Sequence, residues 1–415
     1  MTDLLTAEMT TLDLPWEPDR ARLRRERGAR LRTTMADKGI DALILLANAN
    51  VSYATGTTWP LSDAGRGNVE RPVAVVLAHD AQPHLFTPFV DDAAGELGLD
   101  ADHLHGPTYL DLAEGVTAFG KVLADLVPGG ATIAIDELTG AMHHDRTALL
   151  PDWPPRPASE VMSAVRLTKT TDELACLRRA LWISEQAMAE IQADLVPGAR
   201  QTDLTATYLH RVFDLGAEAN VLDPIWQVMP KFQAELPWTV HGDIACPLIS
   251  TERRLEKGDV LWVDSGISYQ GFHSDFGRTW VVGEEPTARQ QAQYERWAAI
   301  NDAVVAVMRA GVAASDLTAA AAEVCGGERP WMDHFYLGHG LGLDSAEAPY
   351  VGTDLGDAYD HRLVLPAGTV IVLEPVVWDE GHSGYRSENV YVITEDGSVN
   401  LTDYPYDPYG DPHDD

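Results

Sequence analysis

Acidic residues stand inside or at the ends of short apolar runs in the second half of the chain. Asp264 ends the apolar sequence LWV, Glu374 ends TVIVL, and Glu388 stands in the run ENVYVIT. These runs have the length and the β-branched content of strands. A carboxylate in such a strand is costly unless it is paired or bound to a metal ion. The chain must therefore fold so that these three acids gain partners.

The charge of the chain excludes several classes of partner. Its 64 acidic and 30 basic residues give a formal net charge of −34, which would repel nucleic acid and anionic membrane surfaces. No stretch approaches the roughly 18 apolar residues of a membrane helix. The first twenty residues contain no apolar segment of the kind that a secretory signal carries. We expect a cytoplasmic protein without nucleic-acid or membrane partners.

The chain divides at a proline-rich segment. Before it, DALILLANAN, RPVAVVLA and GATIAID predict short strands, and residues 20–38 predict a surface helix that ends before Gly39. The segment DWPPRPAS at residues 152–159 has the proline density of a linker. We therefore predict an N-terminal α/β domain at residues 1–158 and a second domain at residues 159–415.

The second part mixes helices with strands, so we predict the α+β class for the chain as a whole. Thr171 is a suitable N-cap for a long helix, and helical patterns recur at residues 201–216, 287–310 and 315–325. Between these helices lie the strand patterns DVLWVDSGI, GRTWVVG, TVIVLEPVV and ENVYVIT.

Two further residues extend the set of acids. Asp275 follows Asp264 by eleven residues, and the glycines between them permit a hairpin that brings both carboxylates together, although such a pair more often caps turns. His339 lies between Gly338 and Gly340, which let an imidazole reach a crowded centre, or it is a buried structural histidine. Four carboxylates and one imidazole suit a pair of divalent cations, because four negative charges balance four positive ones.

The order of several short motifs resembles that of the pita-bread metallopeptidase family M24. These motifs are DSG, SDFGRT, GHGLGL, LEP and RSEN, and the likeness covers about residues 165–400. The family includes methionine aminopeptidase, Xaa-Pro aminopeptidase and prolidase. KGIDALILLANANVSYATG is similar to the small domain that precedes the catalytic domain in the Xaa-Pro enzymes and in creatinase. The resemblance implies a C-terminal pita-bread catalytic domain behind a smaller N-terminal domain.

The resemblance also implies a dinuclear metal centre. Asp264 would bind one ion, Asp275 and Glu388 would bridge, and His339 and Glu374 would complete the two shells. Two cations that share one water would supply a bridging hydroxide near neutral pH, while one of them polarises the carbonyl under attack. Amide hydrolysis would follow. The resemblance favours Mn, and Fe, Co and Zn also suit this shell.

Two of these residues have a further role by the same resemblance. Glu374 would pass a proton from the bridging water. Arg386 would hold the bridging carboxylates from the same strand as Glu388, with a surface cation as the alternative interpretation. The longer family members commonly form dimers, so we expect a homodimer.

Two histidine positions depart from the family pattern. In the peptidases a second histidine follows the metal-binding one by seven residues, and Ala346 stands there in this chain. The missing donor is typically worth about 2–4 kcal/mol of transition-state stabilisation, so a substitute is required. His241 is the candidate for the other catalytic and substrate-binding histidine, against a plain loop histidine. His273 is expected at the surface.

Three hypotheses follow for function. The first is a dinuclear metal-dependent hydrolase that cleaves an amide bond in short Xaa-Pro peptides. The second, favoured by Ala346, is a small-molecule hydrolase or lyase on the same fold, similar to ectoine hydrolase, creatinase or the lyase of dimethylsulfoniopropionate. The third is a catalytically silent binding protein. The filled ligand set argues against the third and against the metal-free mechanism of creatinase.

Overall fold

The computed structural model describes residues 12–57, 71–232 and 250–405. The chain forms two compact units. One is Pro18–Arg166, and the other combines Met1–Glu17 with Leu167–Asp415. The domain limits expected from the sequence, 1–158 and 159–415, stay a prediction.

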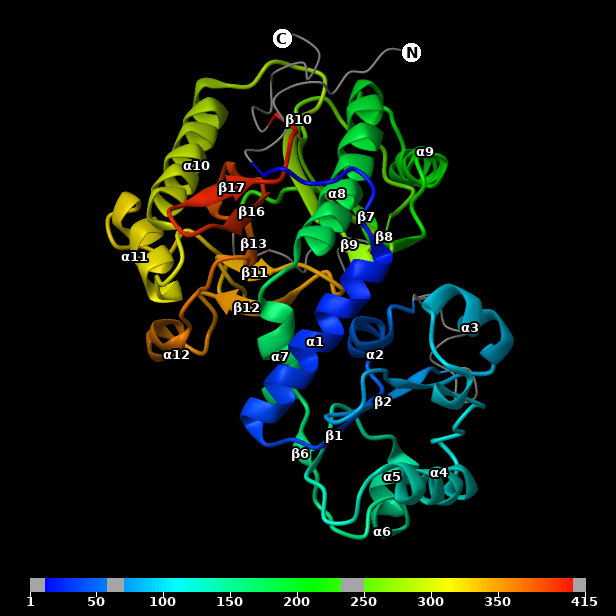
Figure 1. Cartoon of the computed structure of the whole chain (residues 1–415). Coiled ribbons are helices and arrows are strands. Elements are labelled where there is room, and N and C mark those ends of the chain that lie inside the picture. The colour runs from blue at the N-terminus through cyan, green and yellow to red at the C-terminus, as the bar shows by residue number, and fades with distance from the viewer. Residues whose placement is uncertain (1–11, 58–70, 233–249, 406–415) are drawn as a thin grey trace. The chain divides into compact units, whose positions relative to one another are not determined.

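A mixed sheet forms the centre of the unit Pro18–Arg166 (Figure 1). Its strands lie in the order β4 (Leu104–His105), β3 (His84–Phe86), β2 (Val73–Leu77), β1 (Ala42–Leu45), β5 (Ile133–Ile135) and β6 (Arg156–Pro157). The pairs β1–β2 and β2–β3 are antiparallel, and the other neighbours are parallel. Every residue of β1 and β2 is buried, which explains their continuous apolar sequences.

Helices surround this sheet. They are α1 (Arg20–Lys38), α2 (Asn48–Thr55), α3 (Val90–Leu97), η2 (Ala101–His103), α4 (Ala113–Leu126), α5 (Gly140–His144), α6 (Arg146–Leu149) and α7 (Ser159–Leu167). The helix predicted at residues 20–38 is confirmed: Asp19 accepts a hydrogen bond from the Arg22 amide at 2.9 Å, and Gly39 ends the helix at a φ of 64°. The proline-rich segment contains β6, which joins the sheet beside β5.

The other unit contains several sheets. The first holds β10 (Phe276–Val281), β8 (Val260–Tyr269) and β7 (Ala219–Val228), with β9 (Phe272–His273) paired to β8. The second holds β12 (Glu347–Val351), β11 (Gly338–Gly340), β13 (Val370–Leu373), β16 (Asn389–Ile393) and β17 (Ser398–Asn400). The third pairs β14 (Val376–Asp379) with β15 (Ser383–Arg386).

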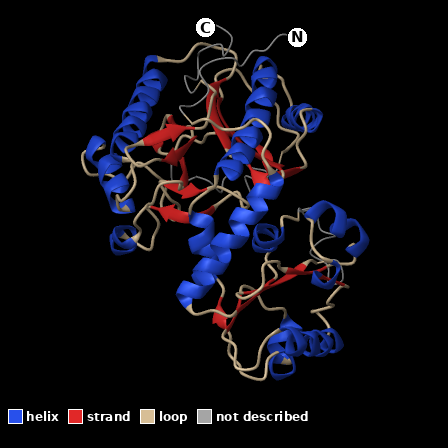
Figure 2. Cartoon of the chain, viewed as in Figure 1, coloured by secondary structure: helices blue, strands red, loops and turns tan. Residues whose placement is uncertain are grey.

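Helices flank these strands (Figure 2). They are α8 (Thr171–Ile191), η3 (Gln192–Asp194), α9 (Gln201–Asp214), α10 (Ala288–Val307), α11 (Ala314–Val324) and α12 (Asp357–Arg362). Apolar side chains of α8 and α9 form one core with β7, β8 and β10, and those of α10 and α11 form another with β13 and β16. Two separate cores thus enclose the strands that carry the acids.

The predicted cap of the first long helix in this unit was wrong by one residue. Thr170, not Thr171, is the N-cap: its hydroxyl accepts a hydrogen bond from the Glu173 amide, and the Glu173 carboxylate accepts one from the Thr170 amide. This capping box satisfies two amides that the helix itself leaves open.

The strands are interrupted at Glu374 and at Glu388. The run TVIVLEPVV is split, because β13 ends at Leu373 and β14 begins at Val376 in a different sheet. The expectation that Arg386 and Glu388 share one strand is wrong, since Arg386 ends β15 and Glu388 lies before β16. The backbone leaves one sheet and enters another at each acid, and this places both acids between the sheets.

Among the described residues, no helix is long and apolar enough to cross a membrane.

Candidate metal centre

Three predicted ligands converge in the unit that follows Leu167. Asp264 lies in the middle of β8, opposite Gly277 of β10, and Asp275 comes directly before β10. Oxygen atoms of Asp264, Asp275 and Glu388 all lie within 4.8 Å of one another, and all three side chains are buried. The hairpin expected from the glycines therefore places the first two acids beside each other, and Glu388 joins them from a distant segment.

Gly277 makes room for Glu388. A Cβ atom at this position would lie 2.7 Å from Cδ of Glu388, closer than real side chains approach. The Glu388 amide donates a hydrogen bond of 3.1 Å to the Gly277 carbonyl. A side chain at position 277 would therefore displace the carboxylate from the centre.

His339 presents one ring nitrogen to the acids. Its Nδ1 donates a hydrogen bond of 2.9 Å to the Gly340 carbonyl, which accepts only. Its Nε2 lies 3.2 Å from Oδ2 of Asp275 and 3.4 Å from Oε1 of Glu374. A histidine whose far nitrogen is held by a carbonyl in this way is oriented as a metal ligand.

Arg386 is buried among the acids, so the surface-cation interpretation is wrong. Its Nη1 lies 3.3 Å from Oδ2 of Asp264, and its Nη2 contacts Oε2 of Glu374 and lies 3.4 Å from Oε2 of Glu388. The guanidinium also lies 4.2 Å from the centre of the Trp262 ring, which favours a cation at that face. Arg386 thus holds three carboxylates in fixed orientations.

The acids carry more negative charge than the chain itself neutralises. Burial and the nearby charge of Asp275 raise the pKa of Asp264 to about 8. Burial also raises the pKa values of Glu374 and Glu388. Burial disfavours the charged form of His339, but the hydrogen bond with Asp275 and the charges of Asp275 and Glu374 outweigh it and raise its pKa to about 9. Cations bound here would relieve this repulsion.

The donor set fits divalent cations. Within the described part of the chain, Oδ1 of Asp264 and Oε1 of Glu388 are buried without a hydrogen-bond partner. A buried carboxylate oxygen without a partner costs free energy, and a cation among the acids would supply that partner. Oxygen-rich shells with one imidazole suit divalent metal ions of several kinds.

Three positions were considered from the sequence in connection with the missing family histidines, and the structure treats them differently. His241 lies outside the described residues. The carbonyl of Ala346 accepts a hydrogen bond of 2.8 Å from the Tyr350 hydroxyl. His273 is buried, and its Nδ1 lies 3.0 Å from Oγ of Ser345, so the expectation of a surface role was wrong.

Tyr336 lies beside the acids and was not singled out from the sequence. Its ring centre is 5.0 Å from that of His339. Burial, and then the charges of Glu374 and Asp275, raise the pKa of its hydroxyl. Its position three residues before His339 was the available signal, but an aromatic residue at that spacing is equally typical of a core.

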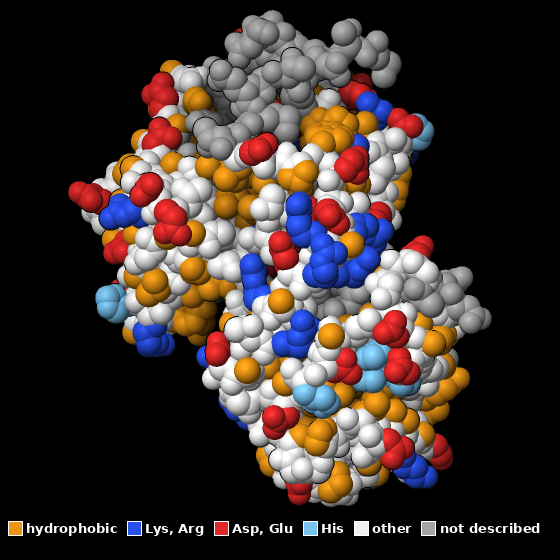
Figure 3. Space-filling model, viewed as in Figure 1, with side chains coloured by type: hydrophobic (Ala, Val, Ile, Leu, Met, Phe, Trp, Pro, Cys, Tyr) orange, Lys and Arg blue, Asp and Glu red, His pale blue; other side chains and the backbone are white. Residues whose placement is uncertain are grey.

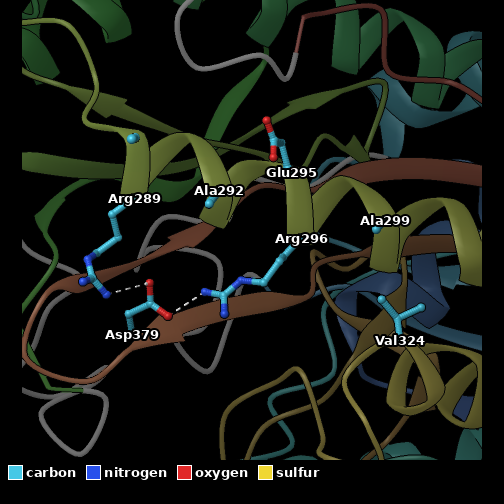
Figure 4. Close-up of a pocket in the computed structure, with 8 residues that line it drawn as sticks. Arg289, Ala292, Glu295, Arg296, Ala299, Val324 and Asp379 are labelled. Atoms are coloured by element: carbon cyan, nitrogen blue, oxygen red, sulfur yellow. Dashed lines mark hydrogen bonds and ion pairs between the residues drawn. The ribbon is translucent and has the colours of Figure 1, made fainter.

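An open groove lies away from these residues (Figure 4). It runs along α10, where Arg289 and Arg296 point toward Asp379 of β14, at 3.7 and 2.7 Å. None of the predicted metal ligands lines it. The groove is therefore a separate surface feature.

Comparison with models of known protein families shows to which family the chain belongs. Residues 175–395 match the model of metallopeptidase family M24. The chain belongs to this family. Residues 27–168 of this M24 peptidase match the creatinase/prolidase N-terminal domain. The predicted family and its hydrolase class are thereby confirmed, and membership of a metallopeptidase family implies divalent metal ions.

Relatives with similar sequences are peptidases by name. A probable dipeptidase PepE of Mycobacterium tuberculosis is 29% identical over 388 residues, which cover 90% of this chain and 92% of the relative. A Xaa-Pro dipeptidase of Pyrococcus furiosus is 30% identical over 245 residues, which cover 59% of this chain and 65% of the relative.

Solved structures of similar fold confirm the predicted pita-bread architecture. The prolidase from Pyrococcus horikoshii superposes with a TM-score of 0.71 at 24% identity, over 92% of this chain and 99% of that protein. A Xaa-Pro dipeptidase from Bacillus anthracis gives a TM-score of 0.73 at 22% identity, over 92% and 98% of the two chains. This M24 peptidase therefore has the expected small N-terminal domain before a pita-bread domain.

Proposed function

We propose that this M24 peptidase hydrolyses the amide bond of short Xaa-Pro peptides at a centre that holds two divalent cations. The convergence of Asp264, Asp275 and Glu388, with carboxylate oxygens that lack a partner in the described part of the chain, carries the proposal. The relatives named Xaa-Pro dipeptidase supply the substrate class.

Five residues would hold the cations: Asp264, Asp275, His339, Glu374 and Glu388. The metal of the proposal is Mn²⁺, and Fe, Co or Zn would also suit this donor set. When bound, such cations lower the pKa of water and polarise a carbonyl group. A homodimer and a cytoplasmic location remain predictions from the sequence.

Glu374 moves the proton in this proposal. Arg386 holds Oε2 of Glu374, while Oε1 faces Nε2 of His339. Oε1 takes a proton from the attacking water and delivers it to the amide nitrogen as the C–N bond breaks. The products are a carboxylic acid and an amine, and Glu374 returns to its starting form.

Tyr336 takes the place of the imidazole that Ala346 lacks. Its ring packs edge-on to His339, and it lies close enough to Glu374 for that charge to act on its hydroxyl. A phenol hydroxyl donates a hydrogen bond to the oxygen that becomes negative during the attack on the carbonyl. His241 remains the predicted second catalytic and substrate-binding histidine.

A second function has one observation in its favour. In this alternative the enzyme is a hydrolase or a lyase that acts on a non-peptide small molecule. Ala346 occupies the position where the peptidases have a histidine, and its backbone carbonyl is engaged by Tyr350. Ectoine, creatine and dimethylsulfoniopropionate represent the substrates of this alternative.

The test exposes the metal-stripped chain, reloaded with Mn²⁺, to Xaa-Pro dipeptides, Xaa-Pro tripeptides and the three small molecules, with products followed by mass spectrometry. We expect cleavage of the Xaa-Pro bond and loss of that activity in Asp264→Asn. The matched control is Asp379→Asn, since Asp379 lies in the separate groove. Intact peptides together with consumption of a small molecule would replace the first function by the second.

A further inference from the structure

A second group of metal-ligating side chains lies in the unit Pro18–Arg166. Ligand atoms of Asp80, His84 and His103 lie within 4.8 Å of one another. Asp80 stands in the turn after β2, His84 begins β3, and His103 ends η2. Figure 3 shows histidine and acidic side chains side by side on the surface of this unit. The group unites three chain segments at one edge of the sheet.

Nε2 of each imidazole lies near one and the same carboxylate oxygen. Nε2 of His103 lies 3.1 Å from Oδ2 of Asp80, and Nε2 of His84 lies 3.8 Å from the same atom. Ligand atoms that share a tetrahedral zinc ion, each about 2.0–2.2 Å from it, lie roughly 3–4 Å apart. The two distances between imidazole and carboxylate fall in this range, and all three ligand atoms lie within 4.8 Å of one another.

The far nitrogen of each imidazole is already held. Nδ1 of His103 donates to Oδ1 of Asp102 at 3.0 Å, and Nδ1 of His84 lies 3.0 Å from Nε2 of His105. When His84 donates this proton to His105, its Nε2 keeps a lone pair. This is the outer support that metal-binding histidines have, because it fixes both the ring orientation and the tautomer.

The carboxylate is held in the same manner. Oδ1 of Asp80 accepts a hydrogen bond of 3.1 Å from the Gln82 amide within the turn, which leaves Oδ2 toward the two imidazoles. The side chains of His84 and His103 are 7% and 11% exposed, whereas that of Asp80 is 27% exposed. Solvent can therefore reach the group on the side of Asp80 and supply a remaining ligand.

We propose that Asp80, His84 and His103 bind one divalent transition-metal ion of the Zn²⁺ class, at a site separate from the catalytic centre. Two imidazole nitrogens and one carboxylate oxygen select Zn²⁺ and similar ions over Ca²⁺ and Mg²⁺, which prefer oxygen ligands throughout. Asp102 and His105 position the two imidazoles. The bound ion joins the turn after β2 to β3 and η2.

The first test counts Zn²⁺ bound to the full chain. Metal-stripped protein is dialysed against Zn²⁺ and then against metal-free buffer, and the retained metal is measured by mass spectrometry. We expect Asp80→Asn and His103→Gln to retain one Zn²⁺ per chain fewer than the wild type. The control is His143→Gln, which removes an exposed histidine of α5 and should retain the wild-type number.

The second test weakens the site from its exposed rim. Asp102 is 83% exposed, so Asp102→Ala should leave the fold intact while it removes the acceptor that orients His103. We expect the affinity for the one Zn²⁺ to fall about 10-fold or more. Asp125→Ala, which removes another exposed carboxylate of this unit, should leave the affinity unchanged.

Two results would overturn the proposal. One is an equal Zn²⁺ count in the wild type and in a folded Asp80→Asn chain, as judged by circular dichroism. The other is an unchanged affinity in Asp102→Ala, which decides the matter even if the Asp80 and His103 variants fail to fold. Peptidase activity with Mn²⁺ should be the same in all these variants, so failure here leaves the proposed catalytic function untouched.

Discussion

The two groups of candidate metal ligands differ in how their polar atoms are satisfied. In the proposed catalytic centre, Oδ1 of Asp264 and Oε1 of Glu388 are buried without a hydrogen-bond partner in the described part of the chain. In the N-terminal group, Oδ2 of Asp80 lies 3.1 Å from Nε2 of His103, and both imidazoles have a partner at Nδ1. A proton on His103 can therefore satisfy Asp80 without a metal ion, whereas the first group keeps buried carboxylate oxygens that no donor of the described chain satisfies.

The two proposed sites would hold metal ions for different physical reasons. The carboxylates between the sheets are close enough to repel one another, so cations there would relieve a cost that folding has imposed. The histidine group carries no such cost. Removal of metal from the acids between the sheets should accordingly lower both activity and stability. Removal of metal from the histidine group should affect only the edge of the N-terminal sheet.

The largest effect is expected from the residue proposed to move the proton. Glu374→Gln keeps the size of the side chain but removes its basicity, so kcat should fall by about 10²–10⁴-fold. Steady-state kinetics on a Xaa-Pro dipeptide measure this, with metal content determined on the same sample. The control is Glu395→Gln, an exposed residue. A variant that keeps its metal and retains wild-type kcat would assign the proton transfer to another group.

The next effect concerns Arg386, the one arginine among the described residues whose guanidinium forms ion pairs with the side chains of Asp264, Glu374 and Glu388. Arg386→Met should lower the free energy of unfolding of the metal-stripped chain by about 3–5 kcal/mol, because Asp264, Glu374 and Glu388 lose a buried partner. The loss should be smaller in the Mn²⁺-loaded chain, where cations compensate.

Denaturant unfolding with and without metal provides the measurement. The matched control is Arg289→Met, since Arg289 is 54% exposed and its pair with Asp379 is worth at most about 1 kcal/mol. Equal losses in the stripped and loaded chains would show that metal charge does not offset the repulsion among these acids.

A third effect concerns the substitute for the family histidine. Tyr336→Phe should lower kcat by about 10²-fold, because the ring and its packing on His339 remain while the donor is lost. Ala346→His in the same chain should recover part of the loss. Tyr359→Phe is the control, since Tyr359 lies on α12. If Tyr336→Phe raises KM and leaves kcat unchanged, the hydroxyl binds substrate but does not stabilise the transition state.

Much of the fold follows from local patterns in the sequence. Periodicity placed the helices of the second unit within a few residues, and β8, β10 and β16 match their apolar runs. It could not show that TVIVLEPVV breaks at Glu374, because both halves are apolar and only the sheets that they join distinguish them. The error at Thr170 has the same character, since two adjacent threonines offer the same cap.

The site was less accessible to sequence analysis. Its acids stood out because carboxylates are rare in apolar strands, and the order of the motifs supplied His339. Tyr336 was missed because its place beside His339 depends on how β11 packs. The N-terminal histidine group was missed because its three members come from different segments, and no spacing joins Asp80 to His103.

The smallest effect is expected when the N-terminal histidine group is altered in the metal-stripped chain. Asp80→Asn should change the free energy of unfolding of the metal-stripped chain by at most about 1 kcal/mol, because the Asp80 side chain is 27% exposed and the pair with His103 is partly solvated. Urea unfolding beside Asp125→Asn measures this difference. Addition of Zn²⁺ should then raise the midpoint of the wild type but not that of Asp80→Asn. A loss as large as that of Arg386→Met would mean that both groups depend on their charges equally, and the contrast between them would fail.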